Sequence, residues 1–343
     1  VGGRAIYCVV KADAYGHGAG PVARRLERGG ASRFAVAVAE EGIELRRSGV
    51  AGEILLLNYS DPADAGLVRA YGLVPSLYDP AQATDFAEAT RGFPEPLAVH
   101  VKVDTGMGRI GFRPEEIGVL IDLVKRSPRL RVAGVFSNLA SADEPGSPAT
   151  AKQVETLKAA VAAIASAGIS PGVVHLANSA AILLHAGAWL DGVRPGLALY
   201  GVPPASDMSE EGLVPAMTIE TEVMAVNDIP AGTPIGYGGR YVTRRASKIA
   251  VIPIGYHDGF RRSFSGRVRV LMRGNEAPVV GAVSMDLTLV DATGLGAKNG
   301  DRVVCLGALD GRCVTAWDLA RAADTVPYEI LCGIGARVPR VSA

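Results

Sequence analysis

Residues 5–28, with the sequence AIYCVVKADAYGHGAGPVARRLER, contain the repeating unit from which the fold can be predicted. The apolar run Ala5–Val10 predicts a buried strand, and the segment Gly20–Arg28 predicts an amphipathic helix. A glycine-containing loop joins the two. A strand, a loop and a helix in this order form one βα unit, and the same order recurs along the first part of the chain.

Eight apolar runs predict eight strands, and their starts lie about 27 residues apart on average, which suits a βα unit. The runs are Ala5–Val10, Phe34–Val38, Glu53–Leu57, Leu73–Leu77, Leu97–Val103, Val132–Phe136, Gly172–Leu176 and Gly192–Arg194. Predicted helices between them are Gly20–Arg28, Glu40–Arg47, Pro62–Tyr71, Pro80–Ala89, Pro114–Lys125, Ala151–Ala167 and Ser179–Ala186. We predict an α/β fold with a (βα)8 TIM-type barrel over residues 1–205. An open, doubly wound sheet is the alternative.

Residues 206–343 show few helical patterns and many turn residues, which predicts a mostly β C-terminal domain. One helix is expected near Thr315–Ala323. The predicted strands are Thr218–Val226, Lys248–Ile254, Arg267–Met272, Ala277–Val283, Asp286–Asp291 and Arg302–Leu306.

Composition excludes several classes of function. Lysine plus arginine and aspartate plus glutamate each total 35, so the net charge is zero, and only 6% of the 343 residues are aromatic. This balance argues against a nucleic-acid or membrane partner. No apolar stretch reaches the roughly 18 residues of a transmembrane helix.

The four cysteines, Cys8, Cys305, Cys313 and Cys332, form no Cys-x-x-Cys pair and have no clustered histidines. We therefore expect neither a metal site nor a disulfide framework, and a cytoplasmic location. The sequence starts at Val1.

Lys11 ends the first predicted strand, at the edge where barrel enzymes place their chemistry. A lysine that loses part of its hydration there favours the neutral amine, which can form a Schiff base. The alternative is a lysine that only extends its ammonium into solvent.

Four further stretches follow apolar runs and end in glycine or small polar residues, which suits loops that offer backbone N–H groups to an anion such as phosphate. They are His100–Gly111, Phe136–Asp143, His175–Ser179 and Arg194–Leu197.

Taken together, these motifs resemble the alanine racemase family, over about residues 5–340. The motifs that carry the resemblance are Val10–Gly18, Lys102–Gly111, His175–Ser179, Arg194-Pro195-Gly196, Ile254-Gly255-Tyr256, Ser284-Met285-Asp286 and Thr325–Ile330. The resemblance implies a barrel with a C-terminal β domain, pyridoxal 5'-phosphate as the cofactor, and interconversion of L-alanine and D-alanine, the latter used for peptidoglycan in bacteria.

The resemblance also implies two catalytic bases on opposite faces of the substrate. Lys11 would hold the cofactor and act on the D-enantiomer, and Tyr237 would act on the L-enantiomer. A phenol needs hydrogen-bonding or cationic neighbours to serve as a base. From the sequence alone, Tyr237 would be interpreted as part of a glycine-rich turn.

Further roles follow from the same resemblance. Arg194 would face the pyridine nitrogen of the cofactor, supported by His175. Arg109 would lie near the cofactor's phenolic oxygen and the substrate carboxylate, and a carbamylated Lys102 would position Arg109. The expected phosphate contacts are Tyr15, Ser179, Gly196, Leu197 and Tyr328.

The family resemblance implies a homodimer with shared active sites. Tyr237, Tyr256 and Met285 would reach the site from the C-terminal domain of the partner subunit, with Tyr256 and Met285 contacting the substrate. Asp143 and Arg262 would line the substrate entrance. Relatives carry roughly 25 more residues before the cofactor lysine, so we expect either that further residues precede Val1 or that a strand and a helix are missing.

Three residues depart from the family pattern. Asn138 replaces a histidine that links the tyrosine base to the pyridine-facing arginine, and Ala282 replaces an arginine of the entrance. His257 is also unusual at its position. These changes leave open a preference for serine or another amino acid.

Two other functions are alternatives to a racemase. Barrel-type decarboxylases place a carboxylate where this chain has Arg194, which favours a racemase. A non-catalytic pyridoxal-phosphate homeostasis protein is a lone barrel and lacks residues equivalent to 206–343.

Overall fold

A computed structural model describes residues 1–208 and 212–341. The chain forms two compact units. Unit 1 comprises Val1–Leu199 and Pro203–Glu211, and unit 2 comprises Tyr200–Val202 and Gly212–Ala343. Each is described by itself.

Unit 1 contains a parallel sheet with the strand order β4-β3-β2-β1-β9-β8-β7-β6-β5. The strands are β1 (Ala5–Val9), β2 (Arg33–Val36), β3 (Glu53–Leu56), β4 (Leu73–Val74), β5 (Ser76–Leu77), β6 (Leu97–Lys102), β7 (Leu130–Phe136), β8 (Val173–Ala177) and β9 (Gly192–Val193).

The barrel closes through the stretch Leu73–Leu77. Pro75 divides this stretch into β4, which pairs with β3, and β5, which pairs with β6, because proline has no N–H to donate to a ladder. The predicted (βα)8 barrel is confirmed, and the open sheet is excluded, because the two ends of the strand order, β4 and β5, belong to one continuous stretch of chain.

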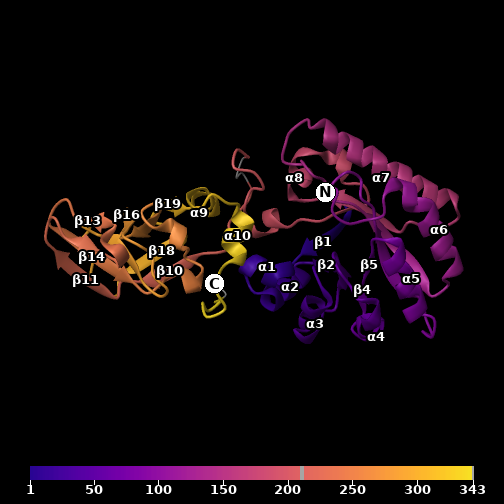
Figure 1. Ribbon diagram of the computed structural model, residues 1–343, viewed down its shortest axis with the longest axis horizontal. Helices are drawn as coiled ribbons and strands as arrows, with labels where there is room; N and C mark the ends of the chain where they lie inside the picture. Colours follow the sequence, from indigo (N-terminus) through magenta and orange to yellow (C-terminus); the bar gives the residue numbers. More distant parts are fainter. Residues whose placement is uncertain (209–211, 342–343) are drawn as a thin grey trace. The chain divides into compact units, whose positions relative to one another are not determined.

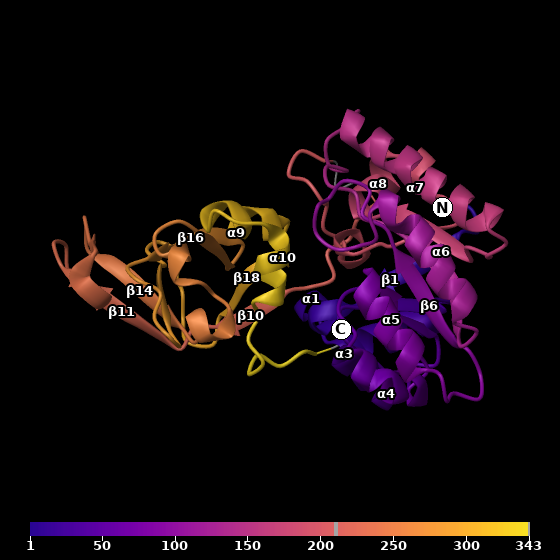
Figure 2. The ribbon, with the colours of Figure 1, turned by 45° about the vertical axis from the view of Figure 1, so that its right-hand side comes forward.

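Helices alternate with these strands and surround them, as Figures 1 and 2 show for α3 to α7. They are α1 (Lys11–Gly16), α2 (Ala19–Arg28), α3 (Ala39–Arg47), η1 (Pro62–Asp64), α4 (Ala65–Ala70), α5 (Pro80–Ala89), η2 (Pro114–Glu116), α6 (Ile117–Arg126), α7 (Pro148–Ser166), α8 (Ser179–Leu184), η3 (Ala186–Ala188) and η4 (Leu197–Tyr200).

The barrel strands are apolar on both faces, because side chains alternate between the interior and the covering helices. Three consecutive residues of β3, Ile54, Leu55 and Leu56, are all fully buried. Local signals begin the helices: the Asp79 carboxylate accepts a hydrogen bond from the Gln82 N–H at the start of α5, where Pro80 is the first residue.

Unit 2 contains an antiparallel sheet, ordered β10-β18-β15-β16-β17-β14-β11, with β19 beside β18, and a separate β12–β13 pair. Its strands are β10 (Ile219–Glu222), β11 (Ala225–Ile229), β12 (Pro234–Ile235), β13 (Tyr241–Val242), β14 (Ser247–Ile252), β15 (Arg269–Met272), β16 (Asn275–Val280), β17 (Thr288–Asp291), β18 (Arg302–Leu309) and β19 (Arg312–Val314). Its helices are η5 (Tyr237–Gly239), η6 (Tyr256–Asp258), η7 (Arg262–Phe264), α9 (Ala316–Ala322) and α10 (Pro327–Cys332).

Two predictions for this unit were wrong in detail. The run Thr218–Val226 is not one strand, because the chain changes partner within it: β10 pairs with β18, and β11 pairs with β14. A second helix, α10, follows α9 and packs against it. Its six residues are too few to show a helical period.

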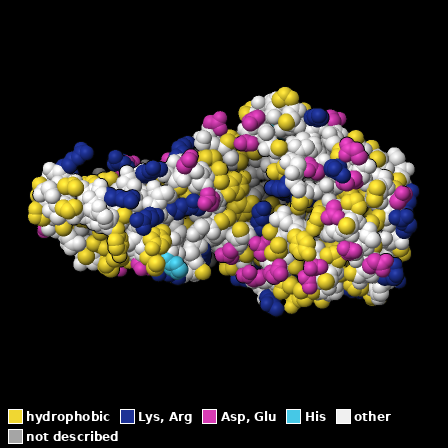
Figure 3. Space-filling model, in the orientation of Figure 1, with side chains coloured by type: hydrophobic (Ala, Val, Ile, Leu, Met, Phe, Trp, Pro, Cys, Tyr) yellow, Lys and Arg dark blue, Asp and Glu magenta, His cyan; other side chains and the backbone are white. Residues whose placement is uncertain are grey.

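Among the described residues, no helix is long and apolar enough to cross a membrane. Acidic and basic side chains are interspersed over the face of unit 1 seen in Figure 3. No group of three or more potential metal ligands occurs among the residues that the structure describes.

Candidate active site

Lys11 lies two residues after the end of β1, and the backbone that follows it is left-handed. The next four residues, Ala12–Tyr15, have φ of 51–53° and ψ of 43–53°, the left-handed helical region. None of them is glycine, and each such residue costs about 1–2 kcal/mol. A strained backbone of this kind persists only where tertiary contacts hold it, and it is typical of functional sites.

Two carboxylates hold this turn. Glu41 of α3 accepts hydrogen bonds from the Ala12 N–H at 2.7 Å and the Ala37 N–H at 2.6 Å. Asp13 accepts from the Ala19 N–H at 2.6 Å. The conformation next to Lys11 is therefore imposed by α2 and α3.

We predict that Glu41→Gln destabilises the turn. Glutamine keeps one acceptor oxygen and loses the charge, so the free energy of unfolding should fall by about 1–3 kcal/mol. Denaturant unfolding measures the loss. Glu40→Gln, on the exposed neighbouring residue of α3, is the matched control. Equal stability of the two variants would contradict a role for Glu41 in holding the turn.

Tyr15, Ser179 and Gly196 form a small polar cradle in unit 1. The Ser179 hydroxyl accepts hydrogen bonds from the Gly196 N–H at 2.9 Å and the Ala198 N–H at 3.2 Å. A Cβ on Gly196 would lie 2.7 Å from the Tyr15 hydroxyl oxygen, so a larger residue there would displace the Tyr15 side chain. Leu197 is fully buried beside it at the start of η4. Hydroxyls and N–H groups gathered in this way suit a phosphate.

Arg194 follows β9 and is buried, with four of its five N–H donors already in use. Nη1 donates to His175 Nδ1 at 2.8 Å and to the His175 carbonyl at 2.9 Å. Nη2 donates to the carbonyls of Ser137 and Leu176. Burial lowers the pKa of Arg194 to about 10, which leaves it charged at neutral pH. None of these four bonds involves the Nε–H of Arg194.

Lys102 ends β6 inside the barrel, where it is 3% exposed. Its ammonium donates to the Leu57 carbonyl at 3.2 Å. Burial, and then the charges of Arg109, Arg194 and Lys11, lower the pKa of Lys102 to about 7. Lys102 thus shares one neighbourhood with three other basic side chains, which disfavour a positive charge on its amine.

Asp104 organises the loop that carries Arg109. Its carboxylate accepts hydrogen bonds from the N–H groups of four residues, 106–109. Burial raises the pKa of Asp104, but these four bonds outweigh it and hold the pKa below its ordinary value. Arg109 is exposed and lines a small hollow together with Lys102 and Asn138.

Unit 2 carries the remaining predicted residues. Tyr237 begins η5, is 72% exposed, and lines an open hollow of about 480 Å³ with Ala282 and Leu287. Tyr328 lies in α10. Arg262 is exposed in η7, and Asp143 is exposed in unit 1, so their assignment to an entrance remains a prediction.

Tyr256 and Met285 lie on two loops that are bonded to each other. The Tyr256 N–H donates to the Ser284 carbonyl at 3.0 Å, and the His257 N–H donates to the Met285 carbonyl at 3.1 Å. A Cβ on Gly255 would lie 2.3 Å from the Met285 carbonyl oxygen. Glycine at 255 therefore permits this close approach.

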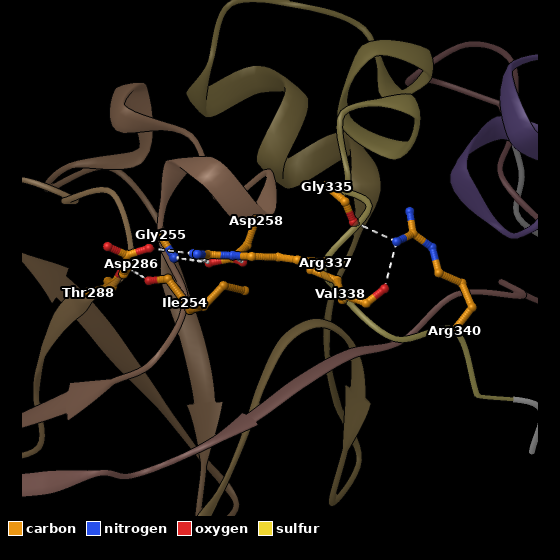
Figure 4. Close-up of polar contacts among 9 residues, drawn as sticks. All are labelled: Ile254, Gly255, Asp258, Asp286, Thr288, Gly335, Arg337, Val338 and Arg340. Atoms are coloured by element: carbon orange, nitrogen blue, oxygen red, sulfur yellow. Dashed lines mark hydrogen bonds and ion pairs between the residues drawn. The ribbon is translucent and has the colours of Figure 1, made fainter.

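Arg337 links the same two loops, lying between Asp258 and Asp286 in Figure 4. Its Nε and Nη2 donate to the two oxygens of Asp258 at 2.5 and 3.0 Å, and Nη2 lies 2.7 Å from Asp286 Oδ1. Asp258 also accepts from the Gly255 N–H. Both carboxylates raise the pKa of Arg337.

We predict that Arg337→Gln loosens the Tyr256 loop. A neutral amide cannot hold both carboxylates, so amide hydrogen exchange over residues 255–258 should speed up roughly tenfold, as expected for the loss of one charge-assisted hydrogen bond. Asp286→Asn, which leaves the Asp258 pair intact, should have a smaller effect. Unchanged exchange in Arg337→Gln would show that the loop holds its position without this arginine.

Unit 1 brings together Lys11, Tyr15, Lys102, Arg109, His175, Ser179, Arg194, Gly196 and Leu197. Sequence reasoning gave no role to His100, Glu41, Asp104 or Arg337. His100 had a usable signal, because it stands two residues before Lys102 on one strand, and alternate residues share a face. The sequence carried no signal for Glu41 or Arg337, because Ala12 and Asp258, which they contact, lie 29 and 79 residues away.

A phosphate-binding βα barrel with a lysine at the end of its first strand, joined to a β domain, defines a two-domain class of cofactor-dependent barrel enzymes. The match to family models is specific. Residues 1–204 match the alanine racemase N-terminal domain, and residues 216–342 match the alanine racemase C-terminal domain. The chain belongs to the alanine racemase family.

Individual relatives agree with this. The chain is 45% identical over 337 residues to an alanine racemase of Symbiobacterium thermophilum, covering 98% of this chain and 89% of the relative. An alanine racemase of Halothermothrix orenii is 40% identical, with the same coverage. The alanine racemase structure from a D-cycloserine-producing Streptomyces lavendulae has a TM-score of 0.95 and 36% identity, covering 99% and 90% of the two chains.

Enzymes of this family depend on pyridoxal 5'-phosphate, and this chain has the residues to hold it. The Tyr15–Ser179–Gly196 cradle suits the phosphate. Arg194 Nε–H, which none of the bonds described above uses, suits a neutral pyridine nitrogen, and Lys11 suits the aldehyde carbon. The chain is an alanine racemase isomerase by family and fold, with the C-terminal unit that lone barrels lack.

Proposed function

We propose that this protein interconverts L-alanine and D-alanine with two bases, Lys11 and the Tyr237 of the partner subunit. The observation that carries the proposal is the assembly in unit 1 of Lys11, a cradle for phosphate and the buried Arg194. When bound, pyridoxal phosphate supplies an electron-withdrawing system that acidifies the α-proton of the amino acid.

The two bases serve opposite faces of the substrate. The Lys11 amine removes or returns the α-proton on the face used by D-alanine, and the Tyr237 phenol does the same for L-alanine. Because each base returns a proton on its own face, inversion requires both. The substrate carboxylate is held by Arg109 and the backbone of Met285, with Tyr256 beside it.

Arg194 limits the chemistry to racemisation. Its guanidinium stays charged and donates one hydrogen bond without giving up a proton, because its pKa remains near 10 in the buried site. The pyridine nitrogen therefore stays unprotonated, which weakens its pull on electrons and disfavours side reactions.

We propose that the active enzyme is a homodimer in which residues 206–343 complete the partner's site. Tyr237, Tyr256, Met285 and Leu287 are all exposed on unit 2, and an exposed apolar group of this kind indicates an interface. The buried thiols of Cys8 and Cys305 support a cytoplasmic location, where thiols stay reduced.

The function is tested in deuterated buffer. Purified protein loaded with pyridoxal phosphate is incubated with single L-amino acids, and the D-enantiomer and α-deuterium are followed. We expect both with L-alanine. Serine tests whether Asn138 and Ala282 widen the substrate range. Neither product with any amino acid, despite a bound cofactor trapped on Lys11 by reduction, would contradict the proposal.

We further predict that Lys102 reacts reversibly with CO2. An amine with a pKa of about 7 is largely neutral above pH 7, and a carbamate would place a negative charge among Arg109, Arg194 and Lys11. Carbamylation should fall as the pH drops below about 7, because the amine then protonates. Carbon-13 NMR with labelled bicarbonate measures it, and Lys102→Met is the control. A carbamate signal that persists in Lys102→Met would refute the assignment.

A further inference from the structure

His100 extends the hydrogen bonds of Arg194 into the barrel interior. Its ring is fully buried, and Nδ1 lies 2.9 Å from His175 Nε2. Gly134 on the neighbouring strand β7 makes room for this ring, since a Cβ there would lie 2.4 Å from His100 Cε1. The fold therefore keeps a space for an imidazole at position 100.

The proton positions along this chain follow from Arg194. A guanidinium has only donors, so His175 Nδ1 must accept from it, and the His175 proton is on Nε2. That N–H points at His100 Nδ1, which must accept in turn. His100 therefore carries its proton on Nε2, where it has no acceptor among the described residues.

The surroundings resist any other arrangement. His175 is stacked between Phe136, at 5.0 Å and 3° between planes, and Tyr7, at 4.6 Å and 21°. Burial and the charge of Arg194 lower the pKa of both histidines, that of His100 to about 3. Both rings are neutral, and a flip of the His175 ring would break its bonds to Arg194 and His100.

We propose that His100 is a positioning residue for the racemase reaction. By accepting the His175 Nε2–H, it holds the ring that holds Arg194, and so fixes the direction of the Arg194 Nε–H, which would donate to the cofactor nitrogen. This inference rests on the proposed function. It also means that the interior side of Arg194 contains two neutral imidazole rings and no imidazolium.

Imidazole NMR tests the proton positions directly. The chain has five histidines, so ring-nitrogen signals can be assigned by single substitutions in the holoenzyme. At neutral pH we expect His175 and His100 to be protonated at Nε2 and unprotonated at Nδ1. An imidazolium at either residue, or a proton on Nδ1 of either ring, would overturn the inference.

Two variants test the positioning role. In His100→Leu, kcat should fall roughly tenfold in both directions, about the worth of one hydrogen bond, with KM for alanine within about twofold. The His175 Nε2–H should also lose its protection from solvent. His100→Asn, whose Oδ1 can accept from His175, should recover most of kcat. Phe86→Leu, a fully buried position in α5, is the packing control and should retain kcat.

The outcomes separate the two proposals. Unchanged kcat and unchanged His175 signals in His100→Leu would overturn the positioning role. Equal losses in the Leu and Asn variants would also overturn it, because they would mean that only ring volume matters. Failure of the unaltered enzyme to racemise any amino acid would instead reject the proposed function, while the NMR result would still decide the proton positions.

Discussion

Replacing Tyr237 with phenylalanine is expected to abolish inversion while sparing proton exchange on one face. General bases contribute about 10²–10⁴-fold, so net racemisation should fall by that amount in both directions, since each direction needs both bases. Deuterium exchange into D-alanine without inversion should persist, because Lys11 still removes and returns that proton. Exchange into L-alanine should be lost. Mass spectrometry after chiral separation measures both.

Tyr241→Phe is the matched control, because it removes another phenol from unit 2, four residues along the chain in β13. It should leave both exchange rates within about twofold. Equal losses of exchange from the two enantiomers in Tyr237→Phe would contradict the division of labour between the bases.

Replacing Arg194 with leucine is expected to produce the largest loss of stability. The change leaves His175 Nδ1 and the carbonyls of Ser137 and Leu176 without their buried donor. An unsatisfied buried acceptor costs about 1–3 kcal/mol, so we expect the free energy of unfolding to fall by about 3 kcal/mol or more. Denaturant unfolding measures it, and cofactor binding should weaken in parallel.

Arg194→Lys should give an intermediate loss, since an ammonium keeps the charge but cannot reach all four acceptors of the planar guanidinium. Arg91→Leu is the surface control, because Arg91 is exposed and, within the described part of the chain, its ion pair is with the exposed Glu88. If Arg194→Leu were as stable as Arg91→Leu, the buried hydrogen bonds of Arg194 would contribute nothing to the free energy of unfolding.

The barrel could be predicted because its signals are local. The strands predicted from apolar runs correspond to the barrel strands. The helix predicted at Pro80–Ala89 has the same bounds as α5, which begins at the Asp79 cap and Pro80. In unit 2 the local signals were weaker. The break between β10 and β11 depends on which strand each half pairs with, and no pattern within nine residues records that choice.

The site divides in the same way. Lys11 was a candidate because it ends a predicted strand, the glycine-rich loops were candidates because of their residue types, and the role of Arg194 followed from the family resemblance. The left-handed turn at Ala12–Tyr15 was not, because none of its residues is glycine and the contacts of Glu41 impose it from 29 residues away.

The sequence by itself determined the order of βα units, the β domain and the residue types that carry the chemistry, since strand and helix periods and short motifs are properties of neighbouring residues. Only the tertiary structure decided how Arg194 is held. The His100–His175 bond joins residues 75 positions apart and exists because the pairing of β6 with β7 and of β7 with β8 brings these strands side by side. The proton positions along the Arg194–His175–His100 hydrogen bonds are set by burial and by contact with a guanidinium that can only donate. Neither the burial nor the contact can be inferred from the sequence.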